Sequence, residues 1–240
     1  MFSLIIIGKI LPLQITSIAE SSDTPYADME SRVKQKKLEQ AGKFISSILS
    51  DDILFAGVSG SVSYVPEPED DIDIYLITRS NRLWRVLLKS FIVCRITENK
   101  DICLSLAFDH EYAVEYYRSF ISGLAAKDSV QVIPFAGLEY YQGLLHSSPE
   151  IMATYQKREN STTESAPVSL GHGSRLSPID LLLYVIVSSW LHLKSLYRNK
   201  KFDRKNMPGD KFQTVTGLHR FYLKTVKYEE LDRKFREGYL

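Results

Sequence analysis

Two short stretches decide the fold of this chain: ILFAGVSGS at residues 53–61 and DDIDIYLIT at residues 70–78. The first is an apolar run suited to a buried strand, and it ends in a turn of small residues. The second alternates with the period of a β-strand. Between them, PEPED at residues 66–70 can be neither a helix interior nor a central strand. We therefore predict two strands separated by a small-residue turn and an exposed acidic loop.

The start of the second strand carries two carboxylates. Residues i and i+2 of a strand point the same way, so Asp71 and Asp73 would lie close together. Two like charges so close are costly unless a cation lies between them, and Mg²⁺ selects such oxygen ligands. Gly60 lets the backbone approach a phosphate closely, and Ser61 can donate to its oxygens. The alternative is a solvated acidic turn beside a glycine that only satisfies a tight turn.

The flanking segments predict alternating helices and strands. An amphipathic helix over residues 26–49 precedes the first strand, and Asn81 can cap a helix with apolar residues over 83–93. A third strand over residues 101–109 has Ile102, Leu104, Leu106 and Phe108 on one face. Helices over 112–124 and 138–157, with an extended piece at 130–134 between them, complete this part of the chain.

The motif of Val58-Ser59-Gly60-Ser61, about ten further residues, and then Asp70-Asp71-Ile72-Asp73-Ile74-Tyr75-Leu76-Ile77 resembles the signature of the nucleotidyltransferase superfamily related to DNA polymerase β. The predicted helices and strands also follow the order of that fold. The resemblance implies an α/β (α+β) chain, with a mixed β-sheet flanked by helices and a nucleotidyltransferase core at residues 29–155. A helical C-terminal region would follow.

The same resemblance implies a transferase chemistry. Asp71 and Asp73 would be the catalytic pair and bind one or two Mg²⁺ (or Mn²⁺) ions. Gly60 and Ser61 would hold the β- and γ-phosphates of a nucleoside triphosphate such as ATP. A hydroxyl or phosphate of an unknown acceptor (a small molecule, a protein or RNA) would attack the α-phosphorus, and pyrophosphate would leave.

Active members of that superfamily usually carry a third carboxylate on the next core strand. In the strand predicted over residues 101–109, the middle position is Ser105. Asp101 and Asp109 each lie roughly 13 Å from it along the strand, so at most one of them could serve. Two alternatives follow: a catalytically degenerate domain that binds a nucleotide or a partner, and an antitoxin-like module that modifies or sequesters a partner protein.

The C-terminal part of the chain differs from the predicted core in its amino-acid composition. Polar residues 156–177 predict a linker or mobile loop, and residues 178–240 a basic helical region. Pro178 suits the start of a helix to about residue 200. Its apolar run at 179–193 is shorter than the ~20 residues that span a bilayer, so we expect a buried helix and no membrane partner. The core would include four aromatic side chains: Trp84, Tyr184, Trp190 and Tyr197.

The charge is balanced overall but unevenly distributed. With 30 Lys and Arg against 29 Asp and Glu, no global field points to nucleic acid or a membrane. Residues 194–240, however, hold 13 basic and 6 acidic side chains. Such a segment is either a solvated helix face or a patch that attracts a triphosphate or RNA. The net positive charge of this segment would also allow it to pack against the acidic remainder of the chain.

The remaining features favour a soluble cytoplasmic protein. The chain has two cysteines, Cys94 and Cys103, which excludes a disulfide scaffold and a multi-cysteine zinc site. The histidines have no partners at metal-ligand spacing. In the apolar start at residues 1–18, Lys9 and Pro12 interrupt the pattern of a signal peptide.

Overall fold

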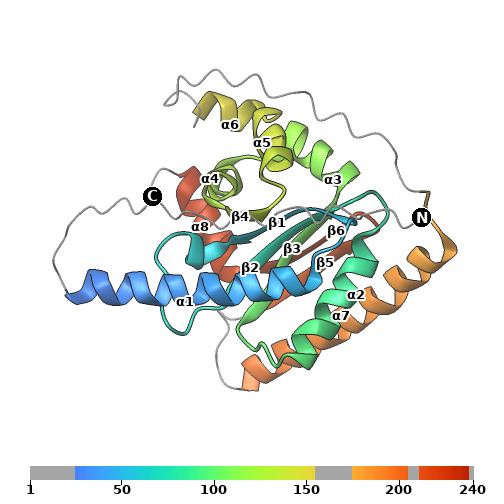
Figure 1. The fold of residues 1–240 in the computed structure, drawn as a ribbon, viewed down its shortest axis with the longest axis horizontal. Coiled ribbons are helices and arrows are strands. Elements are labelled where there is room, and N and C mark those ends of the chain that lie inside the picture. Colours follow the sequence, from blue (N-terminus) through green and yellow to red (C-terminus); the bar gives the residue numbers. More distant parts are fainter. Residues whose placement is uncertain (1–24, 155–174, 205–210, 238–240) are drawn as a thin grey trace, which may run out of the picture.

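The computed structural model describes residues 25–154, 175–204 and 211–237 and confirms a mixed α/β fold. One six-stranded sheet has the strand order β4-β1-β2-β3-β6-β5 (Figure 1). Strands β2 and β3 are parallel, and the other neighbours are antiparallel. The strands are β1 (Ile53–Ser59), β2 (Ile72–Thr78), β3 (Ile102–Asp109), β4 (Ile133–Ala136), β5 (Phe212–Gly217) and β6 (Arg220–Thr225).

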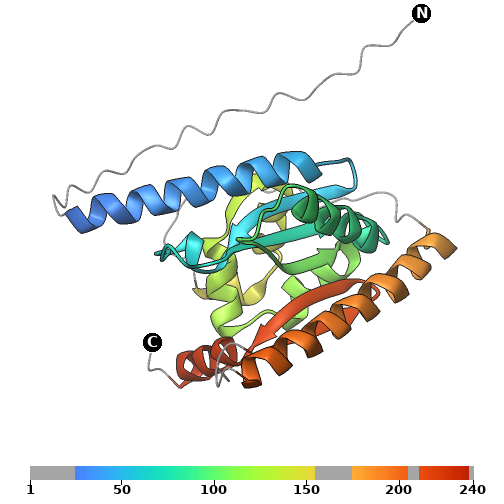
Figure 2. The same ribbon diagram turned by 90° about the horizontal axis from the view of Figure 1, so that it is seen from below.

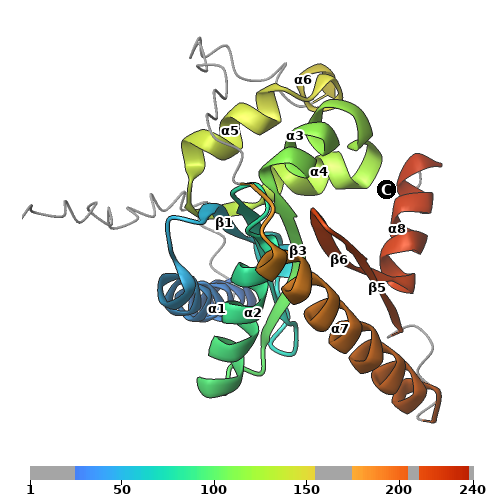
Figure 3. The same ribbon diagram turned by 90° about the vertical axis from the view of Figure 1, so that its right-hand side faces the viewer.

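Helices cover both faces of this sheet (Figures 1 and 3). One face packs against α1 (Pro25–Ile48), α2 (Leu83–Ile96) and α7 (Pro178–Arg204). The other packs against α3 (His110–Glu115), α4 (Gly123–Gln131), α5 (Leu138–His146) and α6 (Pro149–Thr154). The last helix, α8 (Val226–Arg236), lies beside α4 and β6. A two-sided cover explains why the central strands are apolar on both faces.

Strand β2 shows the predicted alternation. Ile72, Ile74 and Leu76 belong to the core under α1 and α2, whereas Tyr75 and Ile77 belong to the core under α3–α6. This period of two places Asp73 on the same face as Tyr75, as the second residue of the strand and half-buried.

The segment after β3 differs from the prediction at its boundaries. The helix expected over 112–124 is instead α3 followed by a π-helical turn (Tyr116–Phe120), and Gly123, with a φ of +57°, begins α4. Because α4 continues to Gln131, the extended piece expected at 130–134 begins only at Val132. Pro149 divides the helix expected over 138–157 into α5 and α6, since it lacks the N–H that a continuous helix needs.

The prediction of a helical region over residues 178–240 is wrong for residues 212–225, which form the hairpin of β5 and β6. This hairpin extends the sheet beyond β3, and its turn is anchored by Trp84 Nε1, which donates to the Leu218 carbonyl at 2.9 Å. Asp109 holds the same turn through His219, whose Nδ1 lies 2.6 Å from Asp109 Oδ2. Asn81 does not cap α2, because it has a φ of +61° and its backbone N–H donates to Asp109.

Helix α7 begins at Pro178 as predicted, but the expectation of a buried helix is wrong. Only a narrow stripe faces the core, and Trp190 and Tyr197 expose 46% and 73% of their surfaces. By length and composition, Pro178–Phe202 could cross a membrane, with a mean hydropathy of 1.4 and 28% of its most apolar part buried. The sequence did not distinguish the inner from the outer face because both are apolar. Trp84 and Tyr184 do join the core.

Two expectations fall largely or wholly outside the described residues. The predicted linker at residues 156–177 is described only at residues 175–177. The apolar start at residues 1–18 is not described at all.

Replacing Asp109 should weaken the junction between α2, β3 and the β5–β6 hairpin. Asp109 is fully buried and accepts hydrogen bonds from the backbone N–H groups of Asn81 and Tyr112 in addition to its contact with His219. We expect Asp109→Asn to lower the free energy of unfolding by about 2–3 kcal/mol, measured by urea denaturation. Glu111→Gln, at an exposed neighbouring position, should change it by less than about 0.5 kcal/mol. Equal stability of the two variants would contradict a structural role for Asp109.

Candidate functional site

The small-residue turn and the acidic strand meet at one contact. In the antiparallel pairing of β1 with β2, Ser59 lies opposite Asp73. The next residue, Gly60, has a φ of +69°, and a Cβ added to it would lie 2.3 Å from Asp73 Oδ2. Both the left-handed backbone and the lack of space therefore require glycine here. The two halves of the predicted site are thus in direct contact.

A lysine of α1 holds the turn that follows Gly60. Residues Gly60–Ser63 form one turn of 3-10 helix, in which Ser63 Oγ donates to the Gly60 carbonyl at 2.7 Å. Lys34 Nζ donates to the carbonyl oxygens of Ser63 and Tyr64, at 3.3 and 2.9 Å. These contacts fix the end of the turn, so Gly60 and Ser61 have a defined position beside β2.

A second lysine, one turn further along α1, holds the acidic loop. Lys37 is 7% exposed, and its Nζ donates to the carbonyl oxygens of Pro68 and Asp70. Asp70 Oδ2 in turn accepts the backbone N–H of Glu67 at 2.8 Å. The loop that precedes β2 is therefore anchored next to Asp71. Sequence analysis did not identify Lys34 or Lys37, although both occupy the otherwise apolar stripe of α1.

The two predicted carboxylates influence each other electrostatically. Burial, and to a smaller extent the neighbouring charge of Asp71, raise the pKa of Asp73 to about 7, although hydrogen bonds from Ser105 and Cys103 act in the opposite direction. Partial burial also raises the pKa of Asp71. Arg198 counteracts that shift, and Asp101 adds to it. A bound cation would relieve the repulsion within this group.

Asp73 pairs with Cys103 of β3, and the side chain of Ser105 also forms a hydrogen bond to Asp73. Ile74 pairs with Leu104 and Tyr75 pairs with Leu106, so Ser105 is the extra residue of a β-bulge. The bulge breaks the predicted alternation: Leu104 packs under α1 and α2, but Leu106 packs on the opposite face. Ser105 nevertheless reaches Asp73, as expected for the middle of this strand.

Of the two carboxylates considered as a third acidic residue of the site, one lies near Asp71 and the other does not. Asp109 belongs to the buried junction with the hairpin, at the far end of β3. Asp101 precedes β3, close enough to Asp71 to affect its pKa. Among the described residues, no group of three or more histidine, cysteine or acidic side chains has the geometry to hold a metal ion.

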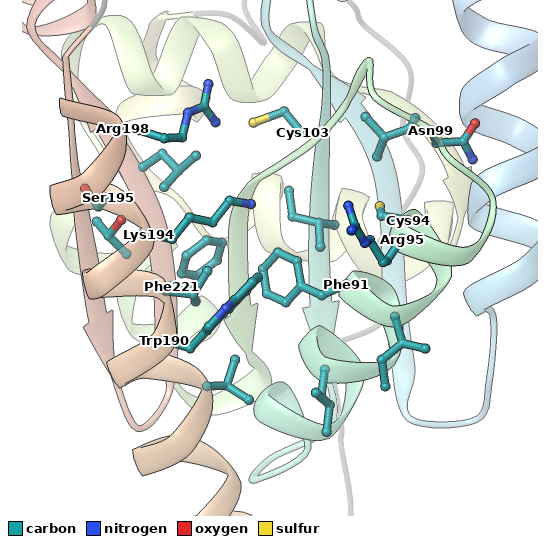
Figure 4. Close-up of a pocket in the computed structure, with 18 of the residues that line it drawn as sticks. Phe91, Cys94, Arg95, Asn99, Cys103, Trp190, Lys194, Ser195, Arg198 and Phe221 are labelled. Carbon is teal, nitrogen blue, oxygen red and sulfur yellow. The ribbon is translucent and has the colours of Figure 1, made fainter. Parts of the chain in front are cut away.

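A pocket of about 1000 Å³ adjoins Asp71 and Cys103 (Figure 4). It lies between α2 and α7 over β3, β5 and β6, at a point where β6 pairs only with Leu106–Phe108 of β3. Aromatic side chains line its interior, among them Phe91, Trp190 and Phe221. The basic C-terminal segment thus contributes to the site through α7.

Two cations of α7, Lys194 and Arg198, point into this pocket (Figure 4). Burial lowers the pKa of Lys194, and the charge of Arg198 lowers it further. Of the two interpretations of the basic segment, this placement favours an anion-attracting patch for Lys194 and Arg198. Lys200 and Lys201 are solvent-exposed on the same helix and do not line the pocket.

The residues present fit a divalent cation with a bound phosphate group. Asp71 and Asp73 provide adjacent oxygen ligands, and the raised pKa of Asp73 reflects the cost of burying its charge beside Asp71, which a cation would offset. Ser61 directly follows the glycine that contacts Asp73, so a phosphate could approach the turn and the carboxylates together. Protein ligands beyond two carboxylates are not required, because Mg²⁺ usually keeps waters and substrate oxygens.

The charge on Asp73 should make stability depend on pH. Its pKa is about 7 in the folded chain against 3.8 for the free group, so between these values the folded chain retains a proton that the unfolded chain has lost. Stability therefore falls as pH rises through this window. We expect Asp73→Asn to raise the free energy of unfolding by about 1–3 kcal/mol at pH 8 without added metal, and to have no such effect below about pH 4.

Urea denaturation across pH measures this difference. Glu69→Gln removes an exposed carboxylate from the adjacent loop and should show no comparable gain at pH 8. A destabilised Asp73→Asn at pH 8 would contradict the electrostatic strain inferred here.

Lys37 should control the order of the acidic loop. In Lys37→Met the apolar stem of the side chain remains, but the carbonyl oxygens of Pro68 and Asp70 lose their donor. We expect faster hydrogen–deuterium exchange at residues 67–71 and a loss of about 1–3 kcal/mol of stability. Lys36→Met changes the exposed neighbour and should leave both unchanged. Equal exchange in the two variants would show that Lys37 does not anchor the loop.

No protein-family model, curated protein or solved structure matches this chain. A function for it therefore rests on the geometry of its own residues.

Proposed function

We propose that this chain is a Mg²⁺-dependent nucleotidyltransferase, which moves a nucleoside monophosphate from a nucleoside triphosphate to a hydroxyl or phosphate acceptor. The observation that supports this most strongly is the contact between Gly60 and Asp73. It brings a turn able to approach a phosphate against a carboxylate pair able to hold a divalent cation. Neither half alone would indicate this chemistry.

The chain's own residues would bind and orient the reactants. Asp71 and Asp73 would hold Mg²⁺, which would supply neutralisation of the developing charge on the phosphates. Gly60 and Ser61 accommodate the terminal phosphates, and Lys194 and Arg198 offset the remaining negative charge from the side of α7. The aromatic interior of the pocket provides a surface for the planar or apolar part of a reactant.

The reaction balances without a further co-reactant. An acceptor oxygen forms a bond to the α-phosphorus, the bond from that phosphorus to the bridging oxygen breaks, and pyrophosphate leaves with the electron pair. A hydroxyl acceptor must also lose a proton, whereas an ionised phosphate acceptor has none to lose. Because Ser105 is not a carboxylate, it cannot act as the base that removes this proton. An ionised phosphate acceptor needs no such base, so it fits the site better than a hydroxyl.

Nucleotide binding should depend on metal and on the Gly60–Asp73 contact. In calorimetric titrations with non-hydrolysable ATP and GTP analogues, we expect wild type to bind in the presence of Mg²⁺. Asp73→Asn and Gly60→Ala should bind at least about 10-fold more weakly, because the first loses a ligand charge and the second places a methyl group against Asp73. Glu69→Gln should bind like wild type. No binding by wild type would overturn the proposal.

A second candidate function is nucleotide or partner binding without turnover, and Ser105 is the observation that favours it. Pyrophosphate release distinguishes the two functions. The acceptors should include tRNA, small hydroxylated metabolites and organic phosphates. Metal-dependent release with any of them supports transfer. Tight Mg²⁺-dependent nucleotide binding with no release across the panel, or a co-purifying partner protein, supports the binding function.

A further inference from the structure

The outer face of α7 is apolar, and no described element covers it. Helix α7 packs against α2 and β5 on its inner side and runs along an edge of the molecule (Figure 2). Eight large apolar side chains on this side of α7 expose between 47% and 73% of their surfaces: Ile179, Leu181, Leu182, Val185, Ile186, Leu193, Leu196 and Tyr197. At roughly 100 Å² each, they expose on the order of 800 Å², and a standard stable interface buries ~800 Å² per partner.

The spacing of these residues matches a helix partner. We define the outer seam as Ile179, Leu182, Ile186, Ser189, Leu193 and Leu196, which repeat at alternating intervals of three and four residues. This spacing forms the contact stripe of two helices that pack side by side along their length. From the start of α7 to Leu196, the seam carries no charged side chain.

The seam complements itself about its centre. In an antiparallel pair the seam positions interdigitate, so Leu182 of one copy lies beside Leu193 of the other, and Ile179 lies beside Leu196. Ile186 then packs beside Ser189 next to the twofold axis, where a small side chain lets the two helices approach closely. In a parallel pair, Lys200, which continues the seam, would face Lys200 of the other copy.

A lipid environment fits these observations less well. Asp180, 2% exposed, accepts hydrogen bonds from Arg82 and Arg85 of α2, and withdrawal of α7 into a bilayer would break this buried group. A helix lying on a membrane surface usually has basic residues along the margins of its apolar face. The exposed cations of α7 gather instead in its C-terminal part, at Lys194, Arg198, Lys200 and Lys201, and residues 178–193 carry no Lys or Arg.

From these observations we infer that two copies of this chain associate through an antiparallel pairing of their α7 helices. The association is independent of nucleotide chemistry and would hold if the proposed function failed. It also accounts for an apolar area larger than soluble monomers usually expose.

Analytical ultracentrifugation of the full chain tests the association. Wild type should sediment with twice the mass of one chain. Leu193→Glu and Leu196→Glu should raise the dissociation constant at least about 100-fold, because each dimer would bury two unpaired carboxylates. These positions are already exposed, so far-UV circular dichroism should be unchanged. Met29→Glu, at an exposed apolar position of α1, should remain a dimer.

Disulfide trapping tests the orientation. Copies carrying Leu182→Cys, mixed with copies carrying Leu193→Cys, should form the 182–193 cross-link under mild oxidation. Peptide mapping distinguishes it from links through Cys94 or Cys103. A monomeric wild type, or a predominant 182–182 link, would overturn the proposal. So would a monomer that floats with anionic phospholipid vesicles in a Leu193-dependent manner, which would assign the face to a membrane.

Discussion

The pairing of β1 with β2 is the constraint on which the candidate site depends. Their antiparallel register sets Ser59 opposite Asp73, so the chain leaving β1 must turn directly over a carboxylate. Glycine is favoured there, because an added Cβ would displace the Asp73 carboxylate and because the φ of +69° strains other residues. A shift of one residue in register would turn Asp73 to the opposite face of the sheet and separate the two halves of the site.

The hydrophobic core and the site share α1. Its apolar residues, including Phe44 and Ile48, pack under the sheet, while Lys34 and Lys37 on the same side reach the loops at the ends of β1 and β2. Burial of the apolar side of α1 therefore fixes the positions of Lys34 and Lys37, and their hydrogen bonds fix the turn after β1 and the loop before β2. Hydrogen bonds from Ser105 and Cys103 and the charge of Arg198 offset part of the electrostatic cost of placing Asp73 beside Asp71. The packing of the sheet around the two carboxylates offsets the remainder.

The parts of the structure that the sequence predicted are those that depend on a local pattern of residues. The alternation of apolar and polar residues predicted β2, and the Gly60-Ser61 and Asp71/Asp73 pairs indicated which ends of β1 and β2 would meet. The bulge at Ser105 was not predicted, because it depends on how β3 aligns with β2. The β5–β6 hairpin was also missed, since its place beside β3 is set by distant contacts such as Trp84 with Leu218. The apolar residues on the outer face of α7 led to the prediction of a buried helix, because the spacing of apolar residues does not show whether another element covers them.

Helix α7 connects the two surfaces on which both proposals depend. Lys194 and Arg198 point inward to the pocket beside Asp71, while Leu193 and Leu196 point outward along the seam. The buried Asp180 fixes the start of α7 to α2 through Arg82 and Arg85, but the far end, where both cations lie, contacts mainly β5. A helix transmits displacement along its length as a rigid element. Support of its outer face by a second copy would therefore restrain the cations relative to Asp71, without any contact between that copy and the site.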